Sequence, residues 1–176
     1  MTDRRAVHPL LLDPSYWRTR LDALPADCGA VWTPRKEQSR DGIEVAEFRL
    51  SAHDGVRLWG LFARPTWISG PWHATVRTVG PADRPEVDSA LVRGGSAEFV
   101  FQEPAGRRLA DRVLDVMQVC RLALATPEIT GVEVEAPDEC RGVGSGDEAA
   151  IAERVMLQHR VTEQWLADGP IRGHLP

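Results

Sequence analysis

The amino-acid sequence predicts an α/β protein: a three-layer domain with a mostly parallel sheet, helices on both faces and an antiparallel N-terminal hairpin at one edge. Two patterns and the chain length lead to this class. Apolar residues alternate with period two over 43–64, on both sides of an Asp-Gly turn. Strand-like and helix-like segments then alternate, an order that gives parallel pairs through right-handed crossovers. The 176 residues, 43% of them hydrophobic, provide enough volume for one core.

The predicted single α/β domain spans 13–170, between a loose N-terminal arm of 1–12 and a C-terminal tail of 171–176. Its first helix starts at Asp13, a favoured N-cap, and Pro14 suits the first helical position. The helix ends at Pro25 and carries an apolar stripe at helical spacing: Trp17, Leu21 and Leu24. The polar stretch 26–42 is predicted to be an irregular surface connection.

The hairpin is predicted over 43–64, with His53-Asp54-Gly55 as its tight turn and Pro65 near its end. The apolar residues of its first strand change phase at 46–47, which indicates a β-bulge: Ile43, Val45, Phe48 and Leu50. A loop that contains Trp67 and Trp72 follows the hairpin.

Strands are predicted at 73–79, 97–102 and 132–136, with a short helix at 85–92 and a long one at 107–125. The long helix has an apolar face that includes Cys120. Its opposite face is expected to be solvated and carries Arg108, Asp111, Arg112 and Asp115. A C-terminal helix follows strand 132–136, stops at 168–170 and has a broad apolar surface: Ile151, Val155, Leu157, Val161, Trp165 and Leu166.

Composition excludes several classes of function. The net charge is −5 and arginines are scattered among acidic residues, whereas a nucleic-acid-binding protein would show a clustered basic face. No apolar run approaches the roughly 18 residues that cross a bilayer, and the N-terminus lacks the pattern of a signal peptide. We therefore expect a cytoplasmic protein with no membrane or nucleic-acid partner.

Neither a disulfide framework nor a metal site is expected. The three cysteines, Cys28, Cys120 and Cys140, are widely spaced and form no C-x-x-C pair. The histidines likewise show no metal-ligand spacing: His8, His53, His73 and His159. No cofactor is predicted.

With these elements in place, the chain resembles the acetyl xylan esterase and cephalosporin C deacetylase branch of the α/β-hydrolases. The resemblance covers about 15–157 and rests on five stretches: YWRTRLDAL, EFRLSAHDGVRLWGLFARP, HATVRTVG, FVFQEPAG and LDVMQVCRLALATPEITGVEV. The hairpin and the helix-to-strand segment are the most specific of them. The resemblance implies an esterase fold, an oxyanion loop after strand 73–79 and a nucleophile directly after strand 132–136.

The chain departs from this family where the chemistry belongs. In the oxyanion loop only Gly80 matches, and the following Pro81 has no N–H to donate to an oxyanion. The family's G-x-S-x-G turn needs glycines on both sides of a serine. In this chain Pro137-Asp138-Glu139-Cys140 occupies that place, so Asp138 is a weak candidate nucleophile.

Ser145 and His174 are the other weak catalytic candidates. Ser145 comes well after strand 132–136, and with Glu148 it fits a capping box at the start of a helix. An anion could also bind at this glycine-containing helix start, although Asp147 and Glu148 add negative charge there. His174 lies in the tail, where nothing predicts the fixed position that a general base needs.

Three hypotheses follow. The first is a shortened, non-catalytic α/β-hydrolase-like protein that acts by association, as a homodimer formed through the C-terminal helix or by edge-strand pairing. The second is an ester hydrolase with a displaced or intermolecular site built on Ser145 or Asp138. The third is a binding module for an unidentified small ligand near the former crevice, using Trp59, Trp67 and Trp72.

Overall fold

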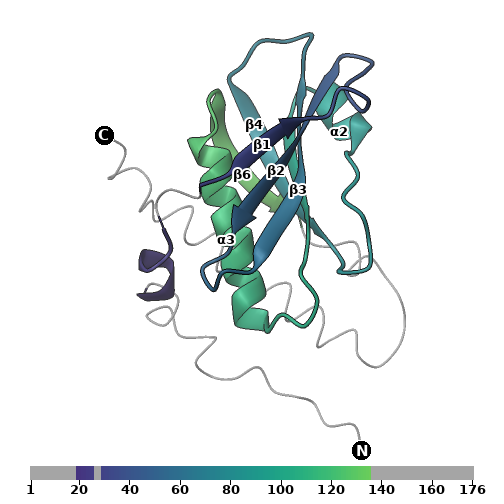
Figure 1. The fold of residues 1–176 in the computed structure, drawn as a ribbon. Helices are drawn as coiled ribbons and strands as arrows, with labels where there is room; N and C mark the ends of the chain where they lie inside the picture. Colours follow the sequence, from purple (N-terminus) through teal and green to yellow (C-terminus); the bar gives the residue numbers. More distant parts are fainter. Residues whose placement is uncertain (1–18, 26–28, 136–176) are drawn as a thin grey trace, which may run out of the picture.

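The computed structural model describes residues 19–25 and 29–135 of the chain (Figure 1). Residues 19–22 form a helical turn. In chain order the elements that follow are β1 (Val31–Pro34), β2 (Ile43–Ser51), β3 (Arg57–Pro65), β4 (Trp72–Val79), α2 (Ser89–Arg93), β5 (Ala97–Gln102), α3 (Leu109–Ala125) and β6 (Ile129–Glu135).

The six described strands form one mixed sheet in the order β1-β2-β3-β5-β4-β6. The α/β class and the N-terminal hairpin are confirmed. β2 pairs antiparallel with both β1 and β3, and β3 also pairs antiparallel with β5. β4 is parallel to both of its neighbours, β5 and β6. The described sheet is therefore an antiparallel half joined to a parallel half along the β3–β5 pair.

The predicted β-bulge at 46–47 is wrong. β2 and β3 pair without interruption from Ile43 opposite Pro65 to Ser51 opposite Arg57. The apolar phase changes because the two faces of β2 are covered at different positions. Ile43 and Val45 belong to the core on the α2 side, whereas Phe48 and Leu50 belong to the core on the α3 side.

The prediction of an irregular connection over 26–42 is also wrong, because β1 lies within it. β1 pairs with β2 from Val31 opposite Arg49 to Pro34 opposite Ala46. The strand is only four residues long and all four are exposed, so its burial shows no alternation. Length and exposure together hide such a strand from a search for periodicity.

The other elements predicted within the described residues are present with shifted ends, whereas the start of the first helix and the C-terminal helix lie outside those residues. α2 begins at Ser89, because the Asp88 side chain caps it by accepting hydrogen bonds from the backbone N–H groups of Ala90 and Leu91. β6 begins at Ile129, earlier than expected, because the Glu128 carbonyl already accepts a hydrogen bond from Trp72 N at 2.7 Å. The helical turn at 19–22 lies on α3, where the Arg121 guanidinium donates to the Leu21 and Leu24 carbonyls.

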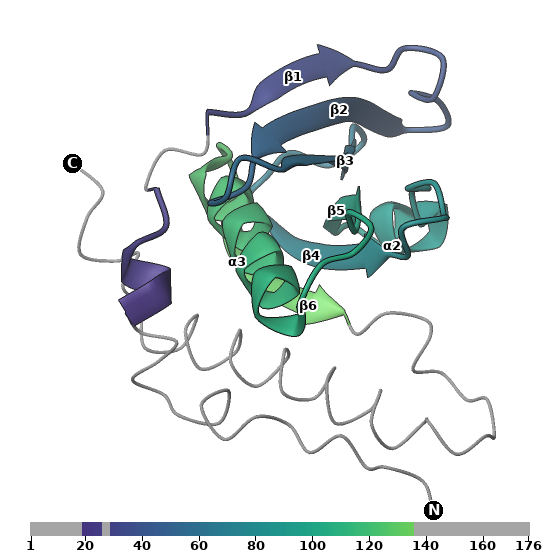
Figure 2. The ribbon, with the colours of Figure 1, turned by 60° about the horizontal axis from the view of Figure 1, so that its bottom comes forward.

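Two helices cover opposite faces of the sheet and complete three layers (Figure 2). On the α3 side the buried core includes Phe48, Leu58, Phe99, Phe101, Val116 and Cys120. On the α2 side it consists of Ile43, Val45, Leu61, Ala63, Val92 and Val100. Gly60 makes the β3–β5 junction possible, because a Cβ there would lie 2.3 Å from the Val100 carbonyl oxygen and 2.7 Å from Phe101 Cβ.

Candidate functional site

The carboxyl ends of β4 and β5 define one edge of the sheet. The hairpin turn at 52–56 lies at the same edge, because β3 starts there and runs antiparallel to β5. β6 also ends at this edge, at Glu135. This carboxyl edge is where α/β proteins commonly bind ligands. The catalytic candidates predicted from the sequence, Asp138, Ser145 and His174, lie outside the described residues.

A buried ion-pair network stands at the start of α3. Arg107 donates from Nε and Nη2 to the two carboxylate oxygens of Asp115, at 2.8 and 2.6 Å, and from Nη1 to Asp54. Asp115 is almost fully buried, so its predicted solvated position is wrong. Burial raises the pKa of Asp115, against the opposing effect of the Arg107 hydrogen bonds. Asp54 is more exposed, and its hydrogen bond from Arg107 lowers its pKa.

A second set of contacts attaches the hairpin turn to α3. The buried Gln118 accepts from His53 N at 2.9 Å through Oε1 and donates to the Ser51 carbonyl from Nε2. His53 Nε2 lies 3.5 Å from Asp111 Oδ1. Together with Arg107, these contacts fix the position of the hairpin turn against the first three turns of α3.

The loop after β4 is held by Gln102, the last residue of β5. Its Nε2 donates to the carbonyl oxygens of Pro81 and Asp83, at 2.9 and 2.6 Å. Its Oε1 accepts from the indole N–H of Trp59 at 2.8 Å. Glu103 follows in the chain and accepts from Arg112 on α3. Polar side chains at the described part of this edge therefore hold loops in place.

The three tryptophans proposed as a ligand site do not lie together, so that grouping is wrong. Trp59 lies at the carboxyl edge, beside Gln102. Trp72 begins β4 at the opposite, amino edge, where it is buried and the Arg64 guanidinium lies 5.5 Å from its ring centre. Trp67 is exposed near Gly42, also beyond the amino end. Closeness in sequence did not show which end of the sheet each ring occupies.

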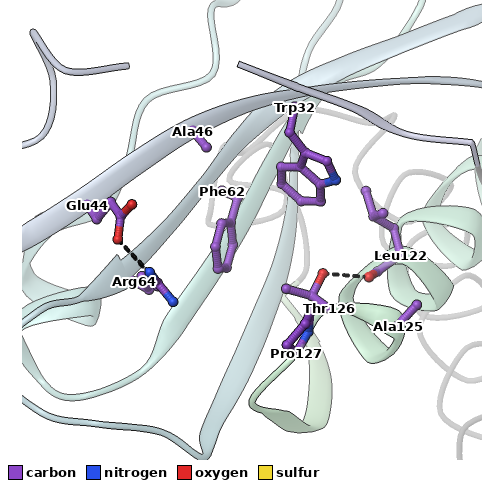
Figure 3. A pocket seen from close by; sticks show the side chains of 9 residues that line it. All are labelled: Trp32, Glu44, Ala46, Phe62, Arg64, Leu122, Ala125, Thr126 and Pro127. Carbon is purple, nitrogen blue, oxygen red and sulfur yellow. Dashed lines mark hydrogen bonds and ion pairs between the residues drawn. The ribbon is translucent and has the colours of Figure 1, made fainter. Parts of the chain in front are cut away.

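A cavity of about 250 Å³ opens at the amino edge, between the antiparallel half and the end of α3 (Figure 3). Its lining residues come from β1, β2, β3, the end of α3 and the α3–β6 connection: Trp32, Glu44, Ala46, Phe62, Arg64, Leu122, Ala125, Thr126 and Pro127. No local pattern in the sequence predicts this cavity. Trp32 lies in the stretch predicted to be irregular, and Phe62 was predicted only as part of a strand. The sequence signal that could have indicated the wall of this cavity is Trp32 within the β-prone run Val31-Trp32-Thr33.

Charged side chains surround one side of this cavity. Arg64 donates to Glu44 from Nε at 2.8 Å, and its Nη1 lies 3.4 Å from Glu128. Opposite them, Thr126 Oγ1 donates to the Leu122 carbonyl at 2.8 Å. Glu44 and Arg64 in the lining balance each other, and Glu128, which contacts Arg64 from outside the lining, adds one negative charge beside the cavity.

The described residues show no group of three or more His, Cys, Asp or Glu side chains that could hold a metal ion. Nor does any helix within them have the length and apolarity required to cross a bilayer. Cys120 is buried on the apolar face of α3, as predicted, and burial raises the pKa of its thiol. A thiol in such surroundings is unreactive.

Neither a protein-family model nor a curated protein sequence matches the chain. Solved structures do. Acetyl xylan esterase from a Paenibacillus species is 12% identical with a TM-score of 0.58, and the match covers 88% of this chain and 57% of that one. Acetyl xylan esterase 1 from a Thermoanaerobacterium species is 13% identical with a TM-score of 0.58, covering 84% and 54%.

The chain thus spans little more than half the length of these esterases. Their likeness, together with the mixed sheet order, supports the resemblance seen in the sequence. At this level of identity the likeness establishes the fold. The described part of the chain therefore has an α/β fold similar to that of acetyl xylan esterases.

Proposed function

We propose that the chain is a non-catalytic α/β-hydrolase-like protein that acts by association. The observation that carries this proposal is that the polar side chains at the described carboxyl edge bind neighbouring loops and α3. Arg107, Gln118 and Gln102 each make at least two contacts that hold a loop or a helix in place. An esterase site requires instead donors and a base directed at a substrate.

The loop after β4 supports this view. An oxyanion hole needs free backbone N–H groups at this position of the fold. Pro81 has none, and the N–H of Asp83 donates to the Gly80 carbonyl at 3.0 Å. Gln102 also draws the carbonyl oxygens of this loop toward β5. The loop is therefore arranged as a closed turn.

For the association, we favour a homodimer formed through β1. Among the described strands, β1 and β6 are the two ends of the sheet. β6 carries Glu133 and Glu135, and two antiparallel copies of it would bring like charges together. β1 instead exposes Val31 (64%) and Trp32 (39%) and has no acidic residue. An apolar edge strand readily pairs with another strand.

Light scattering after gel filtration tests the dimer. The full chain should be a dimer at tens of micromolar, and Val31→Lys should shift it to monomer, because lysine on an edge strand opposes pairing. Ile68→Lys is the matched control, since Ile68 is an exposed apolar residue (42%) outside β1. A monomeric wild type, or equal effects of the two substitutions, contradicts the dimer.

Hydrolysis of 4-nitrophenyl acetate tests the lack of catalysis. We expect no turnover above background from the full chain. Turnover that disappears in Ser145→Ala or Asp138→Asn would establish the alternative, an ester hydrolase with a displaced site. The two experiments are independent, so the dimer can fail while the non-catalytic proposal stands.

A further inference from the structure

The cavity at the amino edge has the form of a binding site. Its volume of about 250 Å³ lies just below the roughly 300–1,000 Å³ of most small-molecule sites, so one ring system with a short substituent would fill it. Small side chains, Ala46 and Ala125, stand at two positions of its wall. Larger residues at either position would occupy the space. The cavity lies at the opposite edge from the carboxyl ends of β4 and β5, so it is separate from the site expected for this fold.

Its aromatic wall is held in place from behind. Trp32 contacts Phe62 edge-to-face, with 5.7 Å between ring centres and 77° between planes. Behind them, Phe99 packs against Phe62 at 4.7 Å. Figure 3 shows Trp32 and Phe62 side by side above Thr126. A ring fixed on its inner side and open on its outer side can bind a ligand with little loss of conformational entropy.

The charges beside the wall decide which ligands fit. Arg64 is engaged by Glu44 and Glu128 and also lies over the Trp72 ring. An anionic ligand would therefore have to displace a carboxylate to reach this arginine. A cation would instead meet the Glu44 carboxylate beside aromatic rings, with the Glu128 carboxylate just beyond Arg64, and both carboxylates and rings attract positive charge.

From this combination we infer that the cavity binds a small aromatic molecule that carries one positive charge. The ring of the ligand packs against Trp32 and Phe62, and its cationic group lies toward Glu44. This inference goes beyond the proposed association and does not depend on it, because a monomer has the complete cavity.

Calorimetric titration of the full chain with three indole compounds tests both parts of the inference. Tryptamine is cationic, indole neutral and indole-3-acetate anionic, while the ring is the same. We expect tryptamine to bind about two- to fivefold more tightly than indole, since exposed ion pairs contribute little more, and indole-3-acetate to bind most weakly. The differences should shrink in high salt. Equal affinities, a preference for the anion or no binding at millimolar concentration overturns the inference.

Variants locate the binding. Ala125→Leu should weaken all three compounds at least about tenfold, because an added side chain fills the cavity. Ala90→Leu, on the exposed side of α2, is the matched control and should change nothing. Glu44→Gln should remove most of the preference for tryptamine over indole, whereas Glu37→Gln, outside the cavity, should keep it. Unchanged affinities in Ala125→Leu would overturn the assignment to this cavity.

Discussion

Arg107 and Asp115 form a pair of parallel hydrogen bonds, Nε to Oδ2 at 2.8 Å and Nη2 to Oδ1 at 2.6 Å, with both side chains buried. Arg107 precedes α3, and its third contact is with Asp54 in the hairpin turn. The network of Asp54, Arg107 and Asp115 therefore links the antiparallel half of the sheet to the helix that leads into β6. Its contribution can be measured separately from any catalytic role.

Asp115→Asn should lower the free energy of unfolding by about 3 kcal/mol, because it leaves the buried Arg107 without its main counter-charge. Asp54→Asn should cost less than about 1 kcal/mol, since Asp54 is partly exposed and its ion pair is screened by solvent. Urea unfolding followed by circular dichroism gives both values. Similar losses for the two variants would show that burial does not set the strength of this network.

The pH dependence of stability should carry a contribution from Glu98. This residue is fully buried, and its carboxylate accepts hydrogen bonds from the Arg77 guanidinium and from the backbone N–H of Asp88. Burial raises its pKa above the ordinary 4.5. The folded state thus holds a proton that the unfolded state has released above pH 4.5. This stabilisation is complete below pH 4.5 and is lost as the pH rises through the folded-state pKa.

Glu98→Gln removes the titrating group and keeps the side-chain shape. In urea titrations across mildly acidic pH, the variant should lack the part of the decline that the wild type shows above pH 4.5. Glu37→Gln, at an exposed site, should follow the wild-type curve. Parallel curves for the wild type and Glu98→Gln would contradict the raised pKa.

Gly60→Ala should destabilise the protein by about 3 kcal/mol or prevent folding, because the new Cβ would lie 2.3 Å from a backbone oxygen of β5. Gly94→Ala is a suitable control. Gly94 has a negative φ, and its nearest contact would be 3.1 Å away. Thermal unfolding should therefore separate the two variants clearly, and a Gly60→Ala protein as stable as the control would refute the close β3–β5 approach.

Cys120 should resist thiol reagents in the folded protein. Its burial excludes reagent and raises the thiol pKa, so little thiolate forms. A variant with Cys28→Ser and Cys140→Ser leaves it as the single thiol. Ellman's reagent should label this variant only when urea unfolds it, and fast labelling without urea would contradict the burial.

The hairpin could be predicted because its pattern is local: alternating residues and an Asp-Gly turn are adjacent in sequence. The long helix and the parallel strands follow from the same kind of regularity. β1 could not be predicted in this way, since its strand character depends on pairing with β2, and four exposed residues have no periodicity. Asp115 was predicted to be solvated because helical spacing alone cannot show that the Arg107 side chain binds its carboxylate in a buried position.

Which residues come together in a site depended even more on contacts between distant parts of the chain. Trp59, Trp67 and Trp72 are close in sequence. However, β3 runs from one edge of the sheet to the other between Trp59 and Trp67, so the last two tryptophans lie at the opposite edge from Trp59. The cavity brings together Trp32, Phe62 and Ala125, which are far apart in the chain, and no single stretch contains its pattern. Asp138, Ser145 and His174 lie outside the described residues, so their proposed roles remain predictions.

The place of β5 between β3 and β4 has a consequence during synthesis. The first three strands are complete once Pro65 has left the ribosome, yet the inner edge of β3 finds its partner only when β5 emerges, ending at Gln102. Throughout that interval the nascent chain presents an open strand edge to its surroundings. Such an edge is a natural target for chaperones and a starting point for aggregation.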